Sequence, residues 1–267
     1  GMVVRSRTRV PKDVIDAARD LKLIVRGGVG LDSIDGKYAT SKGVSVRNTP
    51  KASSNSVAEL TLGYMLALAR RIPQATMSMT AGEWKKKSLR GSEIAGKTLG
   101  LIGFGNIGAL LGGKAAAMGM DVIFYDVSTP DDPGPANQVG LDELLARSDS
   151  ISLHVPKIPA TTNMLNAETF AKMKDGVFVI NCARGGVVDE DALYDALVDG
   201  KVAGAALDVY LDEKVDPGNP KLYQLKDQDG FNRVIGSPHV GASTVEGQAR
   251  VGTEVADILI EFYKENY

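Results

Sequence analysis

The amino-acid sequence predicts an α/β fold built on a doubly wound parallel sheet. From Thr98 onward, apolar runs typical of strands alternate with amphipathic runs typical of helices. The runs VIFY and VFVI are continuously apolar and rich in β-branched residues, as expected for strands buried on both faces. A glycine-rich turn joins the first strand of this series to a helix. These observations predict a sheet with helices on both sides.

A shorter pattern precedes this core: VVRSRT, then PKDVIDAARDLK as a helix, then LIVRGG and VSVRNTP. These few elements cannot close a doubly wound sheet by themselves, because a small sheet buries too little surface. We therefore expect two domains, as the length of 267 residues also allows. The larger is predicted over residues 48–236, and the smaller over 1–47 with 237–267, beginning in the middle of its fold.

Residues 57–71, VAELTLGYMLALARR, predict a long apolar helix between these two patterns. Ser56 and Glu59 have the spacing of a capping box at its start. Such an apolar helix favours a two-fold homodimer, and the isolated Trp84 is expected to anchor one domain to the other. Farther along, Asp189 is a predicted N-cap and Gly200 a predicted C-cap of one helix.

Composition excludes several classes of function. Thirty-one Lys and Arg residues against 33 Asp and Glu residues leave a net charge of -2, so no overall positive field favours nucleic acid. Cys182 is the single cysteine, and no secretory leader is visible, which favours a reducing, cytoplasmic location. No uncharged apolar stretch reaches the roughly 18 to 20 residues that a membrane-spanning helix requires. No Cys or His cluster has the spacing of metal ligands.

Gly103, Gly105 and Gly108 form a GxGxxG pattern after a predicted strand and before a predicted helix. Gly103 permits a tight turn, Gly105 allows close approach of a pyrophosphate, and Gly108 allows the helix to pack on the strand. Asp126 ends the next strand, where a carboxylate can bind ribose hydroxyls and repel a 2′-phosphate. The pattern thus predicts NAD rather than NADP. The alternative is a glycine-rich turn without a ligand.

Three polar groups near the ends of later segments have the chemistry of hydride transfer. Arg184 follows the strand GVFVINCA, and its guanidinium can hold carboxylate and carbonyl oxygens together. His239 can take a hydroxyl proton, and the carboxylate of Glu213 would favour the protonated imidazolium. Each has a simpler interpretation: Arg184 as a surface charge, Glu213 as a solvated carboxylate, and His239 as a residue that caps a turn. His154 is expected to pack near the cofactor.

Longer motifs around these residues, LIGFGNIG, INCARGGVVDE, AGAALDVY and SPHVGAST, resemble those of the D-2-hydroxyacid dehydrogenase family over essentially the whole chain. The resemblance implies a Rossmann domain that binds NAD and an incomplete flavodoxin-like substrate domain lacking its N-terminal part. It implies that Arg184 orients the substrate, that Glu213 is the carboxylate partner, and that His239 exchanges the proton. The cofactor-binding positions it implies are Gly103, Gly105, Asn106, Ile107, Gly108, Asp126, Val155, Cys182, Ala183, Asp208, Val29 and Gly241.

The resemblance also implies a substrate. The loop of Gly28, Val29 and Gly30 resembles the one whose amides hold the substrate carboxylate. Arg5 and Arg7 in VRSRT match basic residues that receive a substrate phosphate. The expected reaction is therefore NAD-dependent oxidation of D-3-phosphoglycerate to 3-phosphohydroxypyruvate, a step of serine biosynthesis.

Two alternatives remain open from the sequence. A glyoxylate or hydroxypyruvate reductase, or another D-2-hydroxyacid dehydrogenase, would share every feature except a need for Arg5 and Arg7. A binding module that senses NAD, like the corepressors of this fold, would bind the cofactor and a peptide partner without turnover. The chain also departs from the family at Lys214, where a proline is usual, and in the longer loop after it.

Overall fold

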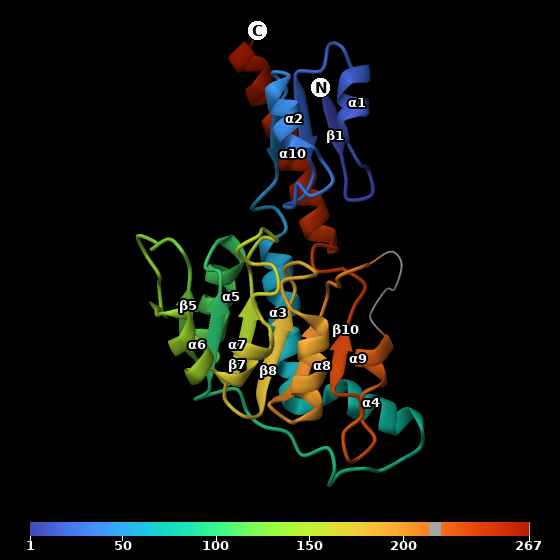
Figure 1. Ribbon diagram of the computed structural model, residues 1–267, viewed down its shortest axis with the longest axis vertical. Helices are drawn as coiled ribbons and strands as arrows, with labels where there is room; N and C mark the ends of the chain where they lie inside the picture. The colour runs from blue at the N-terminus through green and yellow to red at the C-terminus, as the bar shows by residue number, and fades with distance from the viewer. Residues whose placement is uncertain (214–219, 267) are drawn as a thin grey trace. The chain divides into compact units, whose positions relative to one another are not determined.

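The computed structural model describes residues 1–213 and 220–266, which form two compact units (Figure 1). Gly1–Ser56 and Ala242–Tyr267 make up unit 1, and Val57–Gly241 makes up unit 2. The sequence placed these boundaries at residues 48 and 236. Both lie later because Ser56 Oγ bonds to Thr244 Oγ1 at 2.7 Å within unit 1, whereas residues up to Gly241 bond within unit 2.

Unit 1 is a three-stranded parallel sheet in the order β1-β2-β3, formed by Met2–Val4, Leu23–Arg26 and Ser45–Asn48. Helices α1 (Lys12–Ala17) and α2 (Gly36–Ser41) contact each other, and the long helix α10 (Val245–Asn266) packs on β2. Arg47 on β3 forms ion pairs with Glu261 and Glu265 of α10. These contacts join the first and last segments of the chain into one unit.

Unit 2 contains a seven-stranded sheet in the order β10-β9-β8-β7-β4-β5-β6, with every neighbouring pair parallel. The order reverses between β4 and β7, so the loops that follow these strands diverge there and leave room for a ligand. The predicted doubly wound sheet is thereby confirmed. The strands are β4 (Thr98–Ile102), β5 (Asp121–Tyr125), β6 (Ala136–Gln138), β7 (Ser150–Leu153), β8 (Val177–Asn181), β9 (Val202–Leu207) and β10 (Val234–Gly236).

Helices cover both faces of this sheet, each above its own apolar core. On one face, α3 (Ser54–Arg70) and α5 (Asn106–Ala117) pack through Met65 and Leu111. On the other face, α6 (Leu141–Arg147), α7 (Ala167–Ala171) and α8 (Glu190–Val198) bury Leu144, Phe170 and Leu193. The short helix α9 (Pro220–Gln224) adds Leu222 to this second core. The sheet is thus buried on both sides, as its continuous apolar strands predicted.

The predicted apolar helix is confirmed as α3, but its predicted start is wrong. The helix begins at Ser54, two residues before Ser56. Ser56 lies within the first turn and bonds to Thr244 instead of capping the helix. After α3, Arg71 takes a left-handed backbone with φ of 53°, and α4 (Ile72–Thr80) follows in a new direction.

The predicted ends of α8 are confirmed. The Asp189 carboxylate accepts hydrogen bonds from Asp191 N and Ala192 N, both at 3.1 Å, so it caps two otherwise unpaired amides. At the other end, Gly200 follows the C-cap Asp199 with φ of 79°, a conformation that favours glycine. No helix in residues 1–213 and 220–266 is long and apolar enough to cross a membrane.

Candidate active site

The GxGxxG segment forms the turn from β4 into α5. Gly103 has φ of 96°, and a Cβ there would lie 2.6 Å from the carbonyl oxygen of His154. A Cβ on Gly108 would collide with the carbonyl oxygen of Gly103, whereas a Cβ on Gly105 would meet nothing within 4 Å. Gly103 and Gly108 are therefore required for close packing of the backbone. Gly105 keeps open space in front of the first turn of α5, where Asn106 and Ile107 begin the helix.

This open space has the properties of a pyrophosphate site. The first amides of an α-helix have no partner within the helix, and its dipole adds partial positive charge at that end. Helix α5 has 12 residues and no acidic residue in its first turn. Both features favour an anion next to Gly105. The geometry therefore fits the phosphates of a dinucleotide.

Asp126 follows β5 and lies beside the glycine turn. Its Oδ2 accepts a hydrogen bond of 2.7 Å from Phe104 N, and its Oδ1 accepts bonds of 3.0 Å from Ser128 N and Ser128 Oγ. Partial burial by itself would raise the pKa of Asp126, but these hydrogen bonds outweigh it and lower the pKa. Asp126 is thus a carboxylate at neutral pH that holds the glycine turn in place.

Val155 and His154 follow β7, on the other side of the glycine turn. A Cγ1 atom of Val155 would lie 2.9 Å from a Cβ on Gly103, so this side chain lines the turn. The His154 Nε2 lies 3.0 Å from Ser152 Oγ, while its Nδ1 is buried without a partner among the described residues. Burial lowers the pKa of His154 to about 4. His154 is therefore neutral at pH 7 and packs beside the glycine turn.

His239 and Glu213 form a hydrogen-bonded pair in unit 2. The Nδ1 atom of His239 lies 3.0 Å from Oε2 and 2.9 Å from Oε1 of Glu213. His239 has a left-handed backbone with φ of 54°, which costs a residue other than glycine roughly 1–2 kcal/mol. Because Nδ1 faces the carboxylate, Nε2 is left as the nitrogen that can exchange a proton with a substrate.

Arg184 lies just after β8, and the backbone of Gly185 contacts the segment that follows β9. A Cβ on Gly185 would collide with the carbonyl oxygen of Tyr210 and lie 2.8 Å from Leu211 N. The Arg184 loop is thus in backbone contact with the segment that leads to Glu213. Arg184 Nη1 donates a bond of 2.7 Å to the Ala183 carbonyl. Three side chains that the sequence singled out therefore follow β8, β9 and β10 at the same edge of the sheet.

Asp208 is buried, with 1% of its surface exposed, and binds the turn that carries His239. Its Oδ1 accepts bonds from Ser237 Oγ at 2.5 Å and Val240 N at 2.8 Å. Its Oδ2 accepts a bond of 2.8 Å from Gly241 N. The sequence placed Asp208 and Gly241 near the cofactor but did not predict this role. The Gly241 amide is engaged by Asp208, so it is not an available donor.

Cys182 and Ala183 lie buried between β8 and Arg184. Burial raises the pKa of the Cys182 thiol to about 12, so the side chain is a neutral thiol at physiological pH. The Ala183 amide donates a bond of 3.0 Å to Asn181 Oδ1, which fixes the start of the arginine loop. Both residues form an apolar wall rather than a reactive group.

The expected substrate residues of unit 1 surround a glycine turn after β2. Gly28 has φ of 138°, and its amide donates a bond of 2.7 Å to Thr49 Oγ1. The Gly28 amide is therefore engaged by Thr49, and binding of a carboxylate by the loop of Gly28, Val29 and Gly30 stays a prediction. Val29 is exposed and its carbonyl accepts a bond from Asn48, while Gly30 is half-buried.

Arg5 lies beside this turn, since its Cδ would lie 3.3 Å from a Cβ on Gly27, and its guanidinium bonds to Gln248 Oε1. Arg7 is exposed in the turn after β1. The sequence did not single out Arg26, whose guanidinium packs against Gly28 and donates to Ser6 Oγ at 3.1 Å. Its place at the end of β2, directly before the glycines, was the available signal.

The comparisons with known proteins agree with this geometry. Residues 62–241 match the family described as D-isomer specific 2-hydroxyacid dehydrogenase, NAD binding domain. The chain belongs to the D-2-hydroxyacid dehydrogenase family. The resemblance seen in the sequence is thereby confirmed, and NAD is the cofactor of this dehydrogenase.

Individual relatives differ in the substrates that their names give. The dehydrogenase is 50% identical to hydroxypyruvate reductase of Thermotoga maritima over 97% of this chain and 83% of that protein. It is 49% identical to D-3-phosphoglycerate dehydrogenase of Methanocaldococcus jannaschii over 96% of this chain and 48% of that protein. It therefore spans about half the length of the matched phosphoglycerate dehydrogenase.

Solved structures show the same fold. The D-lactate dehydrogenase from Aquifex aeolicus, complexed with NAD and lactic acid, has a TM-score of 0.86 and 35% identity over 99% of this chain and 83% of that chain. D-2-Hydroxyisocaproate dehydrogenase has a TM-score of 0.89 and 28% identity over the same shares. The Rossmann-like architecture of this dehydrogenase is thus shared with enzymes of its family.

A pocket of about 480 Å³ adjoins the His239 and Glu213 pair of the dehydrogenase. It contains His239, Glu213 and the two tyrosines Tyr210 and Tyr223, whose hydroxyl oxygens lie 2.5 Å apart. Both hydroxyls would collide or nearly collide with a Cβ on Gly236, so this position requires glycine. Burial raises the pKa of both tyrosines, which keeps them protonated.

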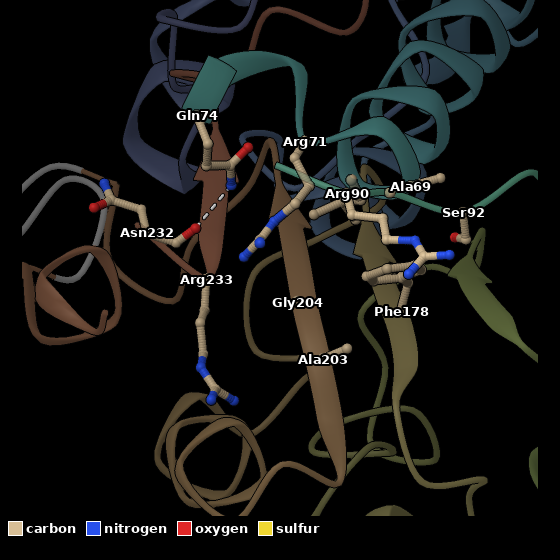
Figure 2. Close-up of a pocket in the computed structure, with 12 residues that line it drawn as sticks. Ala69, Arg71, Gln74, Arg90, Ser92, Phe178, Ala203, Gly204, Asn232 and Arg233 are labelled. Carbon is tan, nitrogen blue, oxygen red and sulfur yellow. Dashed lines mark hydrogen bonds between the residues drawn. The ribbon is translucent and has the colours of Figure 1, made fainter. Parts of the chain in front are cut away.

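A second pocket has a volume of about 370 Å³, and Figure 2 shows the residues that line it. It contains Phe178 and Gly204, which stand near the amino ends of β8 and β9, whereas Arg184 and Asp208 follow their carboxyl ends. Arg71 in this pocket bonds to Asp227 and to the Ser88 carbonyl, and Arg233 bonds to the Leu197 carbonyl. This pocket is therefore separate from the dehydrogenase site.

Proposed function

We propose that this dehydrogenase oxidises D-3-phosphoglycerate to 3-phosphohydroxypyruvate. The observation that carries the proposal is the His239 to Glu213 pair, because it supplies a base with a fixed tautomer for a substrate hydroxyl. The basic residues Arg5 and Arg7 in unit 1 support a phosphorylated substrate. Relatives named D-3-phosphoglycerate dehydrogenase at 49% and 46% identity also support it.

The residues divide the chemistry as follows. His239 Nε2 accepts the proton of the C2 hydroxyl. Glu213, which faces Nδ1, stabilises the imidazolium that results. The Arg184 guanidinium binds the carboxylate and the developing carbonyl of the substrate, for which its planar fork is suited. The glycine turn of residues 103–108 and Asp126 hold the dinucleotide. NAD held by these residues would supply the acceptor for the hydride that leaves C2 of the substrate.

A substrate panel tests this proposal. We would measure steady-state turnover with D-3-phosphoglycerate, D-lactate, glyoxylate and hydroxypyruvate, together with NADH affinity. The highest kcat/KM is expected with D-3-phosphoglycerate. NADH binding without turnover on any of the four substrates would contradict the proposal and favour an NAD-sensing binding module.

The variant Arg5→Ala tests the phosphate assignment. Loss of one charge-assisted contact to phosphate is expected to lower kcat/KM for D-3-phosphoglycerate by about 10- to 100-fold, with little effect on hydroxypyruvate. Arg19→Ala is the matched control, because Arg19 is also exposed but lies between α1 and β2. Equal losses on both substrates would remove the reason for naming the phosphorylated acid.

A hydroxypyruvate reductase is the second candidate. The 50% identical relative from Thermotoga maritima carries that name, and its identity is matched by that of the phosphoglycerate dehydrogenase. The two candidates require the same His239, Glu213 and Arg184. A higher kcat/KM for hydroxypyruvate than for D-3-phosphoglycerate would select the reductase.

We also propose that two copies of the chain form a homodimer through the α4 region. Trp84, which follows α4, is 79% exposed. Met77 and Met79 on α4 are 51% and 59% exposed. Exposed large apolar side chains in one region mark an interaction surface. Light scattering on wild type and on Trp84→Lys tests this, with a dimer expected to become a monomer.

A further inference from the structure

Helix α3 contacts the His239 turn at two points on one helical face. The Tyr64 hydroxyl bonds to Ser237 Oγ, and the Val57 side chain would lie 3.4 Å from a Cβ on Gly241. Residues 57 and 64 are seven positions apart, so they project from the same side of a helix. The two ends of the turn formed by residues 237–241 therefore both rest on α3.

The hydrogen-bond directions in this contact follow from the available protons. Ser237 Oγ donates its single proton to Asp208 Oδ1 at 2.5 Å. The Tyr64 hydroxyl must then donate to Ser237 Oγ. Burial raises the pKa of Tyr64, which keeps this donor protonated at any pH used for an assay. The result is a chain of hydrogen bonds from Tyr64 through Ser237 to Asp208.

This chain of hydrogen bonds holds the backbone that carries His239. Asp208 also accepts the amides of Val240 and Gly241, so its carboxylate joins both sides of the left-handed residue His239. A non-glycine residue keeps a left-handed conformation only where its surroundings enforce it. Without the Tyr64 hydroxyl, the Ser237 Oγ atom loses its only donor among the described residues, and the Ser237 side chain is less constrained beside Asp208.

We propose that Tyr64 is a positioning residue, which acts through Ser237 and Asp208 to hold the His239 imidazole against Glu213. The proposal rests on the proposed function, in which His239 exchanges the substrate proton. Tyr64 does not touch His239 or Glu213, so it affects the position of the imidazole and takes no part in the proton transfer. A misplaced base slows the proton transfer without weakening the binding of the dinucleotide.

Kinetics of three variants test the proposal. Tyr64→Phe and Ser237→Ala are each expected to lower kcat by about 10-fold while KM and NADH affinity stay within about 2-fold, since only the positioned base is disturbed. The double variant is expected to lose no more than either single variant, because both act through one chain of contacts. Tyr38→Phe is the control, since its hydroxyl also bonds to a carboxylate, that of Asp16, on the exposed surface.

A second measurement does not depend on turnover. The chain has only His154 and His239, so a histidine NMR spectrum contains two ring signals. Tyr64→Phe is expected to shift or broaden the His239 signal and leave that of His154 in place. An unchanged His239 signal, an unchanged kcat, or additive losses in the double variant would overturn the proposal. Wild-type inactivity with a shifted His239 signal would refute the proposed function but not the positioning role.

Discussion

The carboxylate of Asp126 accepts a hydrogen bond of 2.7 Å from the backbone amide of Phe104, inside the glycine turn. One carboxylate thus connects the end of β5 to the turn that precedes α5. The same residue is the one that the sequence assigned to the ribose of NAD. If that assignment holds, the choice of cofactor and the shape of the glycine turn depend on one side chain.

The variant Asp126→Ala is expected to weaken NAD binding by about 10- to 100-fold, because charge-assisted hydrogen bonds contribute roughly 1.5–3 kcal/mol each. Preference for NAD over NADP should fall as well, since the negative charge that opposes a 2′-phosphate is removed. Fluorescence titration with NADH and NADPH measures both effects.

Asp149→Ala is the matched control for this experiment. Asp149 accepts a bond of 2.8 Å from Thr98 N, and hydrogen bonds from Thr98 and Lys174 lower its pKa even though burial alone would raise it. It stands at the amino ends of β4 and β7, away from the glycine turn. Its loss should reduce stability without changing cofactor affinity. Equal losses of NADH affinity in both variants would refute a specific role for Asp126.

His239→Gln is expected to reduce kcat by about 100- to 10,000-fold, the usual contribution of a general base. The amide cannot take up a proton, although it is polar and of similar length. NADH affinity should change little, because residues 103–108 and Asp126 bind the dinucleotide. Steady-state kinetics and fluorescence titration test the two parts, and retained turnover would exclude His239 as the base.

Burial of His154 is expected to make the free energy of unfolding depend on pH under acidic conditions. Its pKa is about 4 in the folded chain and near 6.5 when unfolded, so the unfolded chain binds more protons between these values. The free energy of unfolding should therefore fall as the pH drops from 6.5 toward 4, by at most roughly 3 kcal/mol. Urea unfolding at pH 7.5 and 4.5 measures this loss.

His154→Gln removes the titrating ring and should flatten this part of the pH profile. The variant keeps a side-chain amide that can bond to Ser152, so its unfolding at pH 7.5 serves as the reference. A wild-type profile as steep as that of the variant would show that His154 does not contribute.

Gly185→Ala is expected to destabilise the arginine loop, because the added methyl group collides with the Tyr210 carbonyl. Relief of a backbone collision requires the loop to move, which should lower kcat/KM through Arg184 as well as the melting temperature. Gly113→Ala on α5 is the control, since a Cβ there meets nothing within 4 Å and should stabilise the helix by about 0.5–1 kcal/mol. Equal melting temperatures for the two variants would contradict this account.

Much of the larger unit could be predicted from sequence because its signals are local. The continuous apolar strands, the glycine turn before α5 and the caps at Asp189 and Gly200 depend on neighbouring residues, and the structure confirms them. The predicted start of α3 was wrong because Ser56 does not cap the helix. It bonds instead to Thr244, which lies far away in the chain. Local capping rules carry no information about such a partner.

The same distinction applies to the candidate site. Chemistry and motif indicated Arg184, Glu213 and His239, and the structure pairs the last two. The bonds from Asp208 to the His239 turn, the engagement of the Gly28 amide by Thr49 and the place of Arg26 could not be predicted. Each depends on which backbone atoms approach one another across the fold.

The boundary between the units has a consequence for the order of folding. Val57 lies against Gly241 within unit 2, and Ser56 is bonded to Thr244 within unit 1. Once unit 2 has formed, its two ends are side by side, so the separated segments of unit 1 are joined as if by a short connection. Loop-closure entropy that a long unfolded insert would impose is then absent. Unit 1 should consequently acquire its protected amides only after unit 2 has done so.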